Sequence, residues 1–235
     1  MPTTASKIIQ DTLANRRHTL SEFESKQVLA EFGIPVATEV LAKTAREARE
    51  AADQIVYPVA MKACSPQLLH KTESGGVVLN ITTQTDLQQT FESLKTIAPP
   101  PDGILVQAMV PGRRELVVGF NRDAQFGPCV MLGLGGIFTE VLADTAFRAA
   151  PFDRVEALDM MAELRSARIF DAFRGEPPVD REHLAETLLA VADIAVRFPQ
   201  VSELDINPLL VNPEGRCVAV DALIVLDTGL KAEGV

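Results

Sequence analysis

The sequence has few cysteines and no long hydrophobic run. Its 235 residues include three cysteines, Cys64, Cys129 and Cys217, which lie far apart and form no C-x-x-C pair. An odd number of widely spaced cysteines argues against a disulfide framework or a structural zinc site and fits a reducing compartment. No apolar run approaches the roughly 20 residues needed to span a bilayer. The N-terminus lacks the apolar core of a signal peptide, so we expect a cytoplasmic protein without a membrane contact.

Positive charge is also scarce. Lysine and arginine total 22 against 32 aspartates and glutamates, which gives a formal net charge of -10. Nucleic acids and anionic membranes are polyanions, so this balance argues against general binding to either and leaves room only for a local basic site. Hydrophobic residues make up 47% and charged residues 23%, which excludes a disordered or collagen-like chain. A chain of this length holds one or two domains.

Hydrophobic periodicity, capping residues and turn residues predict both helices and strands. Ser21 and Glu24 have the spacing of a capping box at the start of a helix that ends at Gly33. Further helices are expected from Thr44, from Thr85, over 153–168 and over 180–198, and strands over 36–41, 58–63, 77–81, 103–109, 115–121, 128–132, 203–211 and 217–225. Tight turns join neighbouring strands, and strict alternation of strand and helix fails after Gly103. The pattern therefore favours an α+β fold with antiparallel sheets over a doubly wound parallel sheet.

The same pattern predicts where the parts of the chain begin and end. Residues 1–19 resemble an N-terminal extension, and the three prolines at 99–101 are a candidate hinge. We therefore expect an N-terminal lobe over residues 20–102 and a C-terminal lobe over residues 103–235. The sequence shows no internal repeat and no low-complexity tract.

Two residues of the first half carry chemical interest. Lys62 lies in an apolar strand, where a strongly hydrated charge is rare without an anionic partner. It either contacts a phosphate or points outward from a half-exposed strand. His70 lies in a polar loop over 65–76, and imidazole is a nucleophile that can carry a phosphoryl group. The alternative for His70 is a surface histidine in a turn, which is also the interpretation we give to His18 and His183.

A glycine cluster follows the strand predicted over 128–132. Backbone N–H groups at Gly135 and Gly136 can form a nest for an anion, although the segment matches neither the P-loop nor G-x-G-x-x-G. A tight turn is the alternative. Arg148 follows in the sequence and offers a planar cationic fork to an oxyanion.

The C-terminal hairpin carries a more informative pattern. Glu203, Asp205 and Asn207 share one face of a strand because successive side chains alternate, and Asp221 lies on the returning strand. Mg²⁺ prefers such oxygen ligands, completed by phosphate oxygens and water. The alternative is an edge strand whose polar residues face solvent. The carboxylate of Asp221 lies inside an apolar run, where its negative charge needs a positive partner, and a metal ion supplies one.

Together these segments resemble an ATP-grasp domain. More narrowly, they resemble the β subunit of the ADP-forming acyl-CoA synthetases, such as ADP-forming acetate–CoA ligase, which are relatives of succinyl-CoA synthetase. The resemblance covers residues 20–226, and its most specific pieces are 65–77, 126–138, 147–151 and 203–209. Several separated matches in the right order are more specific than any single one. Glu73 stands where an aspartate is more usual in the family, a change that keeps the charge.

The resemblance implies an ATP-grasp fold of two α+β lobes that hold a nucleotide, ATP or ADP, between antiparallel sheets. It implies that Lys62 contacts the nucleotide phosphates and that Glu115 lies near the ribose or the metal. It also implies hydrogen bonds to the base from the backbone of four residues, which are Val106, Gln107, Ala108 and Met109.

The resemblance also implies sites for the metal and the transferred group. The metal set is Mg²⁺ held by Asn207 and Asp221 with Glu203 nearby. His70 matches the β-subunit histidine that carries a phosphoryl group between sites. Gly135 and Gly136 would present backbone donors to that group.

The family reaction interconverts acyl-CoA, ADP and phosphate with a carboxylic acid, CoA and ATP. The CoA and acyl sites belong mainly to an α part, for which this chain has no room. We therefore expect an obligate α subunit, as an α2β2 assembly by analogy, through which CoA and a small carboxylic acid bind. Two other functions stay open. One is a stand-alone ATP-grasp ligase, against which the His70 loop speaks, and the other is a non-catalytic nucleotide-binding regulatory module.

Overall fold

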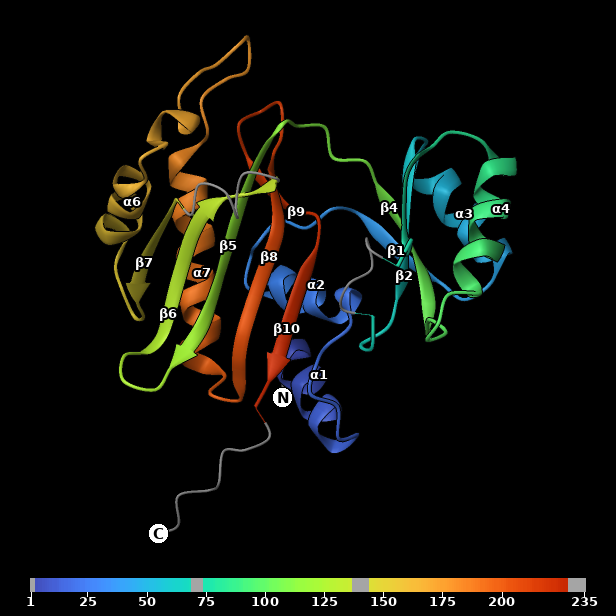
Figure 1. The fold of residues 1–235 in the computed structure, drawn as a ribbon, viewed down its shortest axis with the longest axis horizontal. Coiled ribbons are helices and arrows are strands. Elements are labelled where there is room, and N and C mark those ends of the chain that lie inside the picture. The colour runs from blue at the N-terminus through green and yellow to red at the C-terminus, as the bar shows by residue number, and fades with distance from the viewer. Residues whose placement is uncertain (1–2, 69–73, 137–143, 228–235) are drawn as a thin grey trace. The chain divides into compact units, whose positions relative to one another are not determined.

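The computed structural model describes residues 3–68, 74–136 and 144–227, and the chain divides into two compact units (Figure 1). The larger unit comprises Met1–Leu20, Glu24–Val36 and Pro111–Val235, and the smaller one comprises Ser21–Phe23 and Ala37–Val110. Every strand ladder in the described part of the chain is antiparallel. The predicted α+β class with antiparallel sheets is therefore confirmed.

The smaller unit is a four-stranded sheet in the order β1-β4-β2-β3 with two helices packed on it. Its elements are β1 Glu39–Ala42, α3 Ala45–Ile55, β2 Val59–Cys64, β3 Val77–Ile81, α4 Gln84–Lys95 and β4 Gly103–Ala108. Thr83 caps α4 by accepting a hydrogen bond from Asp86 N–H at 3.1 Å. The predicted cap at Thr85 is wrong, because Thr83 has the extended backbone of a cap and Thr85 already lies in the first turn.

The larger unit is a six-stranded sheet in the order β10-β8-β5-β6-β7, and β9 also pairs with β8. Its strands are β5 Arg114–Asp123, β6 Gly127–Leu134, β7 Thr145–Ala149, β8 Val201–Val211, β9 Cys217–Ala219 and β10 Ala222–Leu226. Its helices are α1 Thr4–Ala14, α2 Glu22–Glu31 (which begins in the smaller unit), α6 Arg154–Glu163, the 3-10 helix η2 Ala167–Phe170 and α7 Arg181–Arg197. Helix α7 packs on β5 and β6 and α6 packs on β7, so one face of the sheet is buried.

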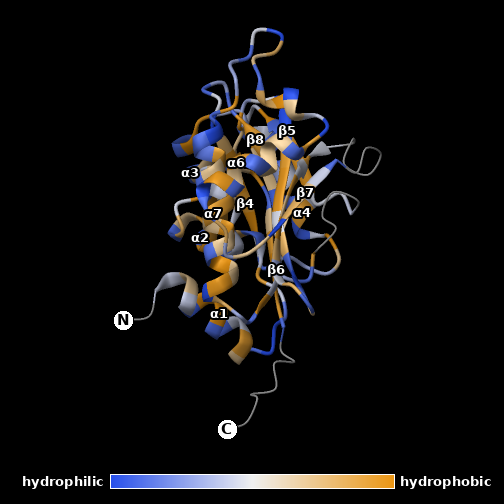
Figure 2. Cartoon of the chain, turned by 90° about the vertical axis from the view of Figure 1, so that its left-hand side faces the viewer, coloured by the Kyte–Doolittle hydropathy of each residue, from blue (hydrophilic) through white to orange (hydrophobic). Residues whose placement is uncertain are grey.

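The amphipathic pattern explains why these helices cover a sheet. Leu184, Leu188, Val191 and Ile194 of α7 are all fully buried, at the spacing of one helix face. Hydrophilic and hydrophobic residues both occur along α2, α3 and α7 in Figure 2. In the described ranges, no helix combines the length and the apolar character that crossing a bilayer requires.

The unit boundaries differ from the predicted lobes over 20–102 and 103–235. Residues 1–19 are part of the larger unit, because Ala5 and Ile9 of α1 are buried in its core. Strand β4 belongs to the smaller unit, because it lies between β1 and β2. The boundary therefore falls after Val110, and the three prolines at 99–101 lie inside the smaller unit.

The strand predicted over 217–225 is two strands. Val211 to Leu209 of β8 pair with β9, and the segment from Val201 to Ile206 pairs with β10. The ladder is interrupted at Pro208, which has no N–H to donate. Asp221 lies opposite this interruption, and its carbonyl accepts from Asn207 N–H at 3.3 Å.

Candidate functional site

One face of β8 is polar and the other is apolar. Leu204 and Ile206 are buried in the core, whereas Glu203 and Asn207 are exposed and Asp205 is partly buried. The prediction that Glu203, Asp205 and Asn207 share a face is therefore confirmed. They lie on the side of the sheet opposite the buried core, which we call the open face.

The strand register shows which other side chains share the open face with Asp205. Residues paired across an antiparallel ladder lie on the same face. Asp205 pairs with Gly119, Gly119 with Met131, and Met131 with Phe147, so one row crosses four strands. A cavity of about 210 Å³ opens along this row and is also lined by Cys129. The open face thus has an acidic end on β8 and an apolar end on β7.

Gly119 permits the close approach of β5 to β8. A Cβ atom at this position would lie 2.3 Å from the carbonyl oxygen of Leu204, which is closer than atoms can pack. Any side chain there would push the two strands apart. The narrow part of the cavity beside Asp205 therefore depends on this glycine.

Charges of one sign gather at the acidic end. Burial and, to a smaller extent, the neighbouring carboxylates of Glu203 and Asp221 together raise the pKa of Asp205 to about 6. Three carboxylates thus lie close enough to repel one another, which is the electrostatic condition for attracting a cation.

The interruption opposite Asn207 positions Asp221. Its Oδ1 accepts a hydrogen bond from Ala222 N–H at 2.9 Å, which fixes the side chain at the start of β10. Next to it, the ammonium group of Lys26 in α2, only 1% exposed, donates to Val220 O at 3.1 Å. A buried cation therefore adjoins the residue that precedes Asp221, a feature that the sequence analysis missed.

The oxygen donors fit Mg²⁺ as a partial ligand set. In the described ranges, no three His, Cys, Asp or Glu side chains stand together as a complete metal cage. Mg²⁺ does not need one, because it commonly takes one or two carboxylates and completes its shell with phosphate oxygens and water. An ion that arrives with a phosphate ligand fits the oxygen donors of Asp221, Asn207 and Glu203. The repulsion at Asp205 favours the same ion.

Glu115 and the glycine cluster meet where β5 and β6 pair. Gly135 N–H donates to Glu115 O at 2.7 Å, and a Cβ at Gly135 would lie 2.9 Å from the Glu115 backbone. Gly136 has a φ of +70°, and a Cβ there would lie 2.9 Å from Glu115 Oε2. Gly135 is therefore needed for its close approach to the Glu115 backbone, and Gly136 for its positive φ. The N–H of Gly135 is engaged in the sheet, which corrects its predicted role as a donor to a phosphoryl group.

Arg148 lies on the opposite side of the sheet from the carboxylates. It pairs with Val130, which pairs with Phe120, which pairs with Leu204, and this row is the buried face. Its guanidinium forms an ion pair with Glu163 of α6 at 2.6 Å. The predicted role of Arg148 as a cationic fork at the reaction site is therefore wrong. The error came from missing β7, whose alternation brings its neighbour Phe147 to the open face instead.

In the smaller unit, Lys62 is buried with an anionic partner. Its side chain is 4% exposed, and Nζ lies 2.7 Å from Oε1 of Glu22, which is 1% exposed. The alternative of an outward-pointing lysine is therefore wrong. Glu22 was not singled out in the sequence, where only its position in the first turn of a helix marks it.

Strand β4 limits which residues can offer backbone groups to a base. Its Val106 and Gln107 have partners in both β1 and β2, and Ala108 N–H donates to Thr38 O at 2.8 Å. The backbone of Val106 and Gln107 therefore belongs to the sheet, as does the N–H of Ala108, which argues against their predicted contacts with the base. Met109, the first residue after the strand, is the member of the predicted set that lies beyond the ladder.

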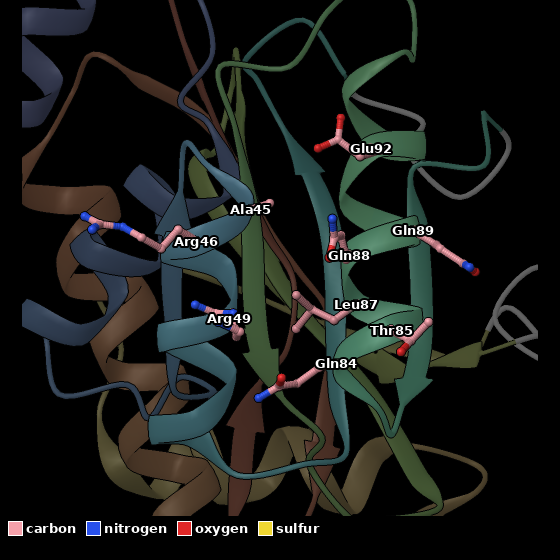
Figure 3. Close-up of a pocket in the computed structure, with 9 residues that line it drawn as sticks. All are labelled: Ala45, Arg46, Arg49, Gln84, Thr85, Leu87, Gln88, Gln89 and Glu92. Atoms are coloured by element: carbon pink, nitrogen blue, oxygen red, sulfur yellow. The ribbon is translucent and has the colours of Figure 1, made fainter.

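His70 lies outside the described residues. A separate cavity of about 970 Å³ lies between α3 and α4 in the smaller unit, where the side chains of both helices reach into it (Figure 3). It contains none of the predicted site residues, and it is lined by Ala45, Arg46, Arg49, Gln84, Thr85, Leu87, Gln88, Gln89 and Glu92.

Comparison with known proteins gives consistent matches over nearly the whole chain. Residues 11–226 match the model of the ATP-grasp domain. The chain is 40% identical over 228 residues to the β subunit of acetate–CoA ligase [ADP-forming] I of Pyrococcus furiosus, covering 94% of this chain and 97% of that one. It is 41% identical over 228 residues to acetate–CoA ligase [ADP-forming] I of Archaeoglobus fulgidus, of which it spans 33%.

A solved structure agrees with these matches. It is the dinucleotide-forming acetyl-coenzyme A synthetase 1 of Ca. Korarchaeum cryptofilum with coenzyme A and Mg-AMPPCP, its phosphohistidine segment pointing towards the nucleotide-binding site. The TM-score is 0.82 at 34% identity, covering 95% of this chain and 100% of that one. The predicted ATP-grasp fold is thereby confirmed. The chain belongs to the ATP-grasp family and, within it, to the family of the β subunits of ADP-forming acetate–CoA ligases.

Proposed function

We propose that this chain is the nucleotide-binding β subunit of an ADP-forming acid–CoA ligase. In this function it moves a phosphoryl group between a histidine and ADP during the interconversion of acyl-CoA, ADP and phosphate with a carboxylic acid, CoA and ATP. The observation that carries the proposal is the acidic end of the open face. There, Glu203, Asp205 and Asn207 share one face of β8 beside Asp221, and a solved relative of the same fold holds Mg-AMPPCP.

The metal set proposed from this observation is Asn207, Asp221 and Glu203. A Mg²⁺ ion held there supplies charge neutralisation for the phosphate oxygens during transfer. Asp205, between its neighbours, adds negative potential without being required as a ligand. Asn207 contributes a neutral oxygen, which limits the repulsion that a fourth carboxylate would add at this point.

The roles of the remaining residues follow from their placement. Lys62 adds a positive charge for phosphates, and its ion pair with Glu22 orients its side chain. Met109 and the residues after it offer the backbone groups for the base. Glu115, whose carboxylate lies beside Gly136, faces the ribose or the metal.

The transfer itself balances as a reversible displacement. A nitrogen of His70 attacks the γ-phosphorus of ATP, the N–P bond forms as the bond from phosphorus to the β-γ bridging oxygen breaks, and ADP leaves. The reverse step regenerates ATP and neutral imidazole. Phosphoryl transfer depends mainly on positioning and charge neutralisation, which the carboxylate-held ion and Lys62 provide.

The partner in this proposal is an α subunit that carries the CoA and acyl sites. The P. furiosus relative is a β subunit of the length of this chain, whereas the A. fulgidus relative is a single protein about three times as long. By analogy with the relative that is named a β subunit, we propose that the CoA and acyl sites lie on an α subunit, in an α2β2 assembly. A cytoplasmic location stays a prediction.

The test is phosphorylation of the purified chain. Incubation with Mg²⁺ and γ-labelled ATP should give a label that is stable in base and labile in acid, and His70→Asn should abolish it. Added ADP should recover the label as ATP. Asp221→Asn is expected to lose at least tenfold in labelling rate while the fold is retained.

The same experiment separates the alternatives. A stand-alone ligase would consume ATP with an acid and an amine or thiol and form no protein-bound phosphate. A regulatory module would bind the nucleotide without turnover. Label that is unchanged in His70→Asn would contradict the phosphohistidine role directly.

A further inference from the structure

Val220 and Asp221 form the bend between β9 and β10, and hydrogen bonds hold this bend against β8. Val220 N–H donates to Pro208 O at 3.1 Å, and Asn207 N–H donates to Asp221 O at 3.3 Å. Ala222 N–H donates to Asp221 Oδ1 at 2.9 Å. These bonds hold the peptide group that follows Asp221. The direction of its side chain depends as well on the peptide group that precedes it.

Lys26 of α2 holds that preceding peptide group. The carbonyl oxygen of Val220 belongs to the peptide group that joins Val220 to Asp221, and it accepts a hydrogen bond from Lys26 Nζ at 3.1 Å. Lys26 is 1% exposed, so bulk water does not compete for this bond. A hydrogen bond from an ammonium group is also stronger than one from a neutral donor. Both peptide groups that flank the Cα atom of Asp221 are therefore fixed by named partners.

The segment that contains α2 is anchored to both strands that flank the bend. Before the helix, Leu20 N–H donates to Ile224 O of β10 at 3.0 Å. After the helix, Pro35 O accepts from Ala219 N–H of β9 at 2.8 Å. Lys26 lies on α2 between these two anchors (Figure 1). A shift of the helix along β9 and β10 would break an anchor, so the ammonium group has a fixed position relative to the bend.

Packing alone does not explain a lysine at this position of α2. Burying a lysine costs more free energy than burying an apolar side chain of similar length. Val28 and Leu29 of the same helix are 0% exposed and supply its packing on the core. A methionine in place of Lys26 would pack at lower cost. What the lysine adds is its charged hydrogen-bond donor, and that donor is directed at the bend.

We propose that Lys26 is a positioning residue of the metal site, which acts through Val220 O to hold the Asp221 carboxylate in the orientation that binds Mg²⁺. The proposal rests on the proposed function, in which Asp221 is a ligand of the ion. In this role Lys26 acts through the backbone and needs no contact with the ion or the nucleotide. Removing a group that orients a metal ligand commonly lowers metal affinity by about 10- to 100-fold.

The test measures ion and nucleotide binding by the full chain. Calorimetry gives the affinity for ADP with Mg²⁺ and with EDTA, and electron paramagnetic resonance gives the affinity of the ADP complex for Mn²⁺. Lys26→Met keeps the length of the side chain and removes the donor. It should weaken Mn²⁺ binding and Mg²⁺-dependent ADP binding at least tenfold, while the ADP affinity in EDTA stays within twofold of the parent chain.

A double-mutant cycle shows whether Lys26 acts through Asp221. Asp221→Ala alone should weaken Mn²⁺ binding at least tenfold. Adding Lys26→Met to Asp221→Ala should change the Mn²⁺ affinity by less than a further twofold, because the carboxylate that Lys26 positions is gone. Losses that multiply in the double variant would overturn the inference.

Arg122→Met is the matched control. The Arg122 guanidinium also donates to backbone carbonyls of the larger unit, to Ala195 O at 2.8 Å and to Val201 O at 3.1 Å. Val201 is the first residue of β8 and lies about 20 Å from Asn207 along an extended strand. The control should therefore lower stability and leave the Mn²⁺ affinity within twofold. A loss equal to that of Lys26→Met would assign the effect to stability and overturn the inference.

A second variant and a measurement without a variant cover the case in which Lys26→Met does not fold. Lys26→Gln keeps a neutral N–H donor and should weaken Mn²⁺ binding at least threefold. Amide hydrogen exchange of the parent chain should show Ala219, Val220 and Ala222 protected before nucleotide is added, because the bend is held in advance. Rapid exchange at these amides would overturn the inference.

The outcomes separate the inference from the proposed function. If Asp221→Ala loses Mn²⁺ affinity and Lys26→Met does not, the inference is overturned while the proposed function stands. If Mg²⁺ does not raise the ADP affinity of the parent chain, or Asp221→Ala binds Mn²⁺ as the parent does, the proposed metal set fails and the inference fails with it.

Discussion

The crowded carboxylates on β8 predict that removing one of them stabilises the protein at neutral pH. The change is Asp205→Asn, which keeps the shape of the side chain and removes its charge. Asp205 is partly buried, no hydrogen bond to its carboxylate occurs within the described ranges, and its pKa is raised from 3.8 to about 6. The folded state therefore holds the proton more tightly than the unfolded state does.

The magnitude and sign follow from this difference. Each pKa unit corresponds to about 1.36 kcal/mol, so ionising Asp205 at pH 7.5 costs the folded state up to about 3 kcal/mol. The favourable contribution of the protonated group is complete below pH 3.8, decreases as the pH rises, and is lost above about 6. We expect Asp205→Asn to raise the free energy of unfolding by about 1 to 3 kcal/mol at pH 7.5 and by roughly half as much at pH 5.

Urea unfolding of the nucleotide-free chain at the two pH values measures this difference. Asp159→Asn is the control, because Asp159 is an exposed aspartate of α6 outside this cluster, and it should change stability by less than about 0.5 kcal/mol at both pH values. Glu203→Gln should act in the same direction as Asp205→Asn by removing a repelling neighbour. A loss of stability in Asp205→Asn at pH 7.5, or a gain that is equal at pH 5, would refute the reasoning.

Three further perturbations test individual assignments. Lys62→Met should cost about 3 to 5 kcal/mol of unfolding free energy because it removes the ion-pair partner of the buried Glu22 carboxylate, and Lys62→Met with Glu22→Leu should recover most of it in the same urea titration. Arg148→Ala should leave the phosphorylation rate within about twofold and lower the free energy of unfolding by at most about 1 kcal/mol, since its half-exposed ion pair lies on the buried side of the sheet. A hundredfold loss in the labelling rate would restore its catalytic assignment. Gly119→Ala should destabilise the chain by roughly 2 kcal/mol or more through the clash with Leu204 O, and normal stability by thermal denaturation would contradict that contact.

Period-two alternation made the acidic face of β8 predictable. Polar and apolar residues alternate strictly from Glu203 to Asn207, and a strand in an antiparallel sheet can satisfy that pattern in only one way. The capping box of Thr44 and Glu47 likewise located α3 to within a residue, because a threonine side chain that accepts a backbone N–H is a local interaction, and the helical pattern over 180–198 located α7. Local chemistry was therefore a sound guide at Thr44, whereas at α4 it pointed to Thr85 and the cap is Thr83.

Features that depend on pairing between distant segments were not predictable in the same way. Nothing local in Glu22 indicates that it meets Lys62, 40 residues away, in a buried ion pair. The backbone of Val106 and Gln107 looks available in the sequence, and only the strand order shows that β1 and β2 occupy it. The division of the chain after Val110 has the same cause, since the proline run at 99–101 marks a loop and says nothing of where β4 pairs.

The contrast between Arg148 and Phe147 shows how the sheet separates structural from functional residues. Arg148 was expected to contact an oxyanion at the reaction site because it follows the glycine cluster in the sequence. On β7, however, neighbouring residues face opposite sides, so Phe147 joins the row with Asp205 and Arg148 joins the row with Leu204. In the proposed function, the positive charge that balances the transferred phosphate comes instead from the ion that the β8 carboxylates attract. In the proposed function the repulsion among these carboxylates is also what attracts Mg²⁺, so we expect the stability gained by Asp205→Asn to be accompanied by weaker Mg²⁺-dependent nucleotide binding.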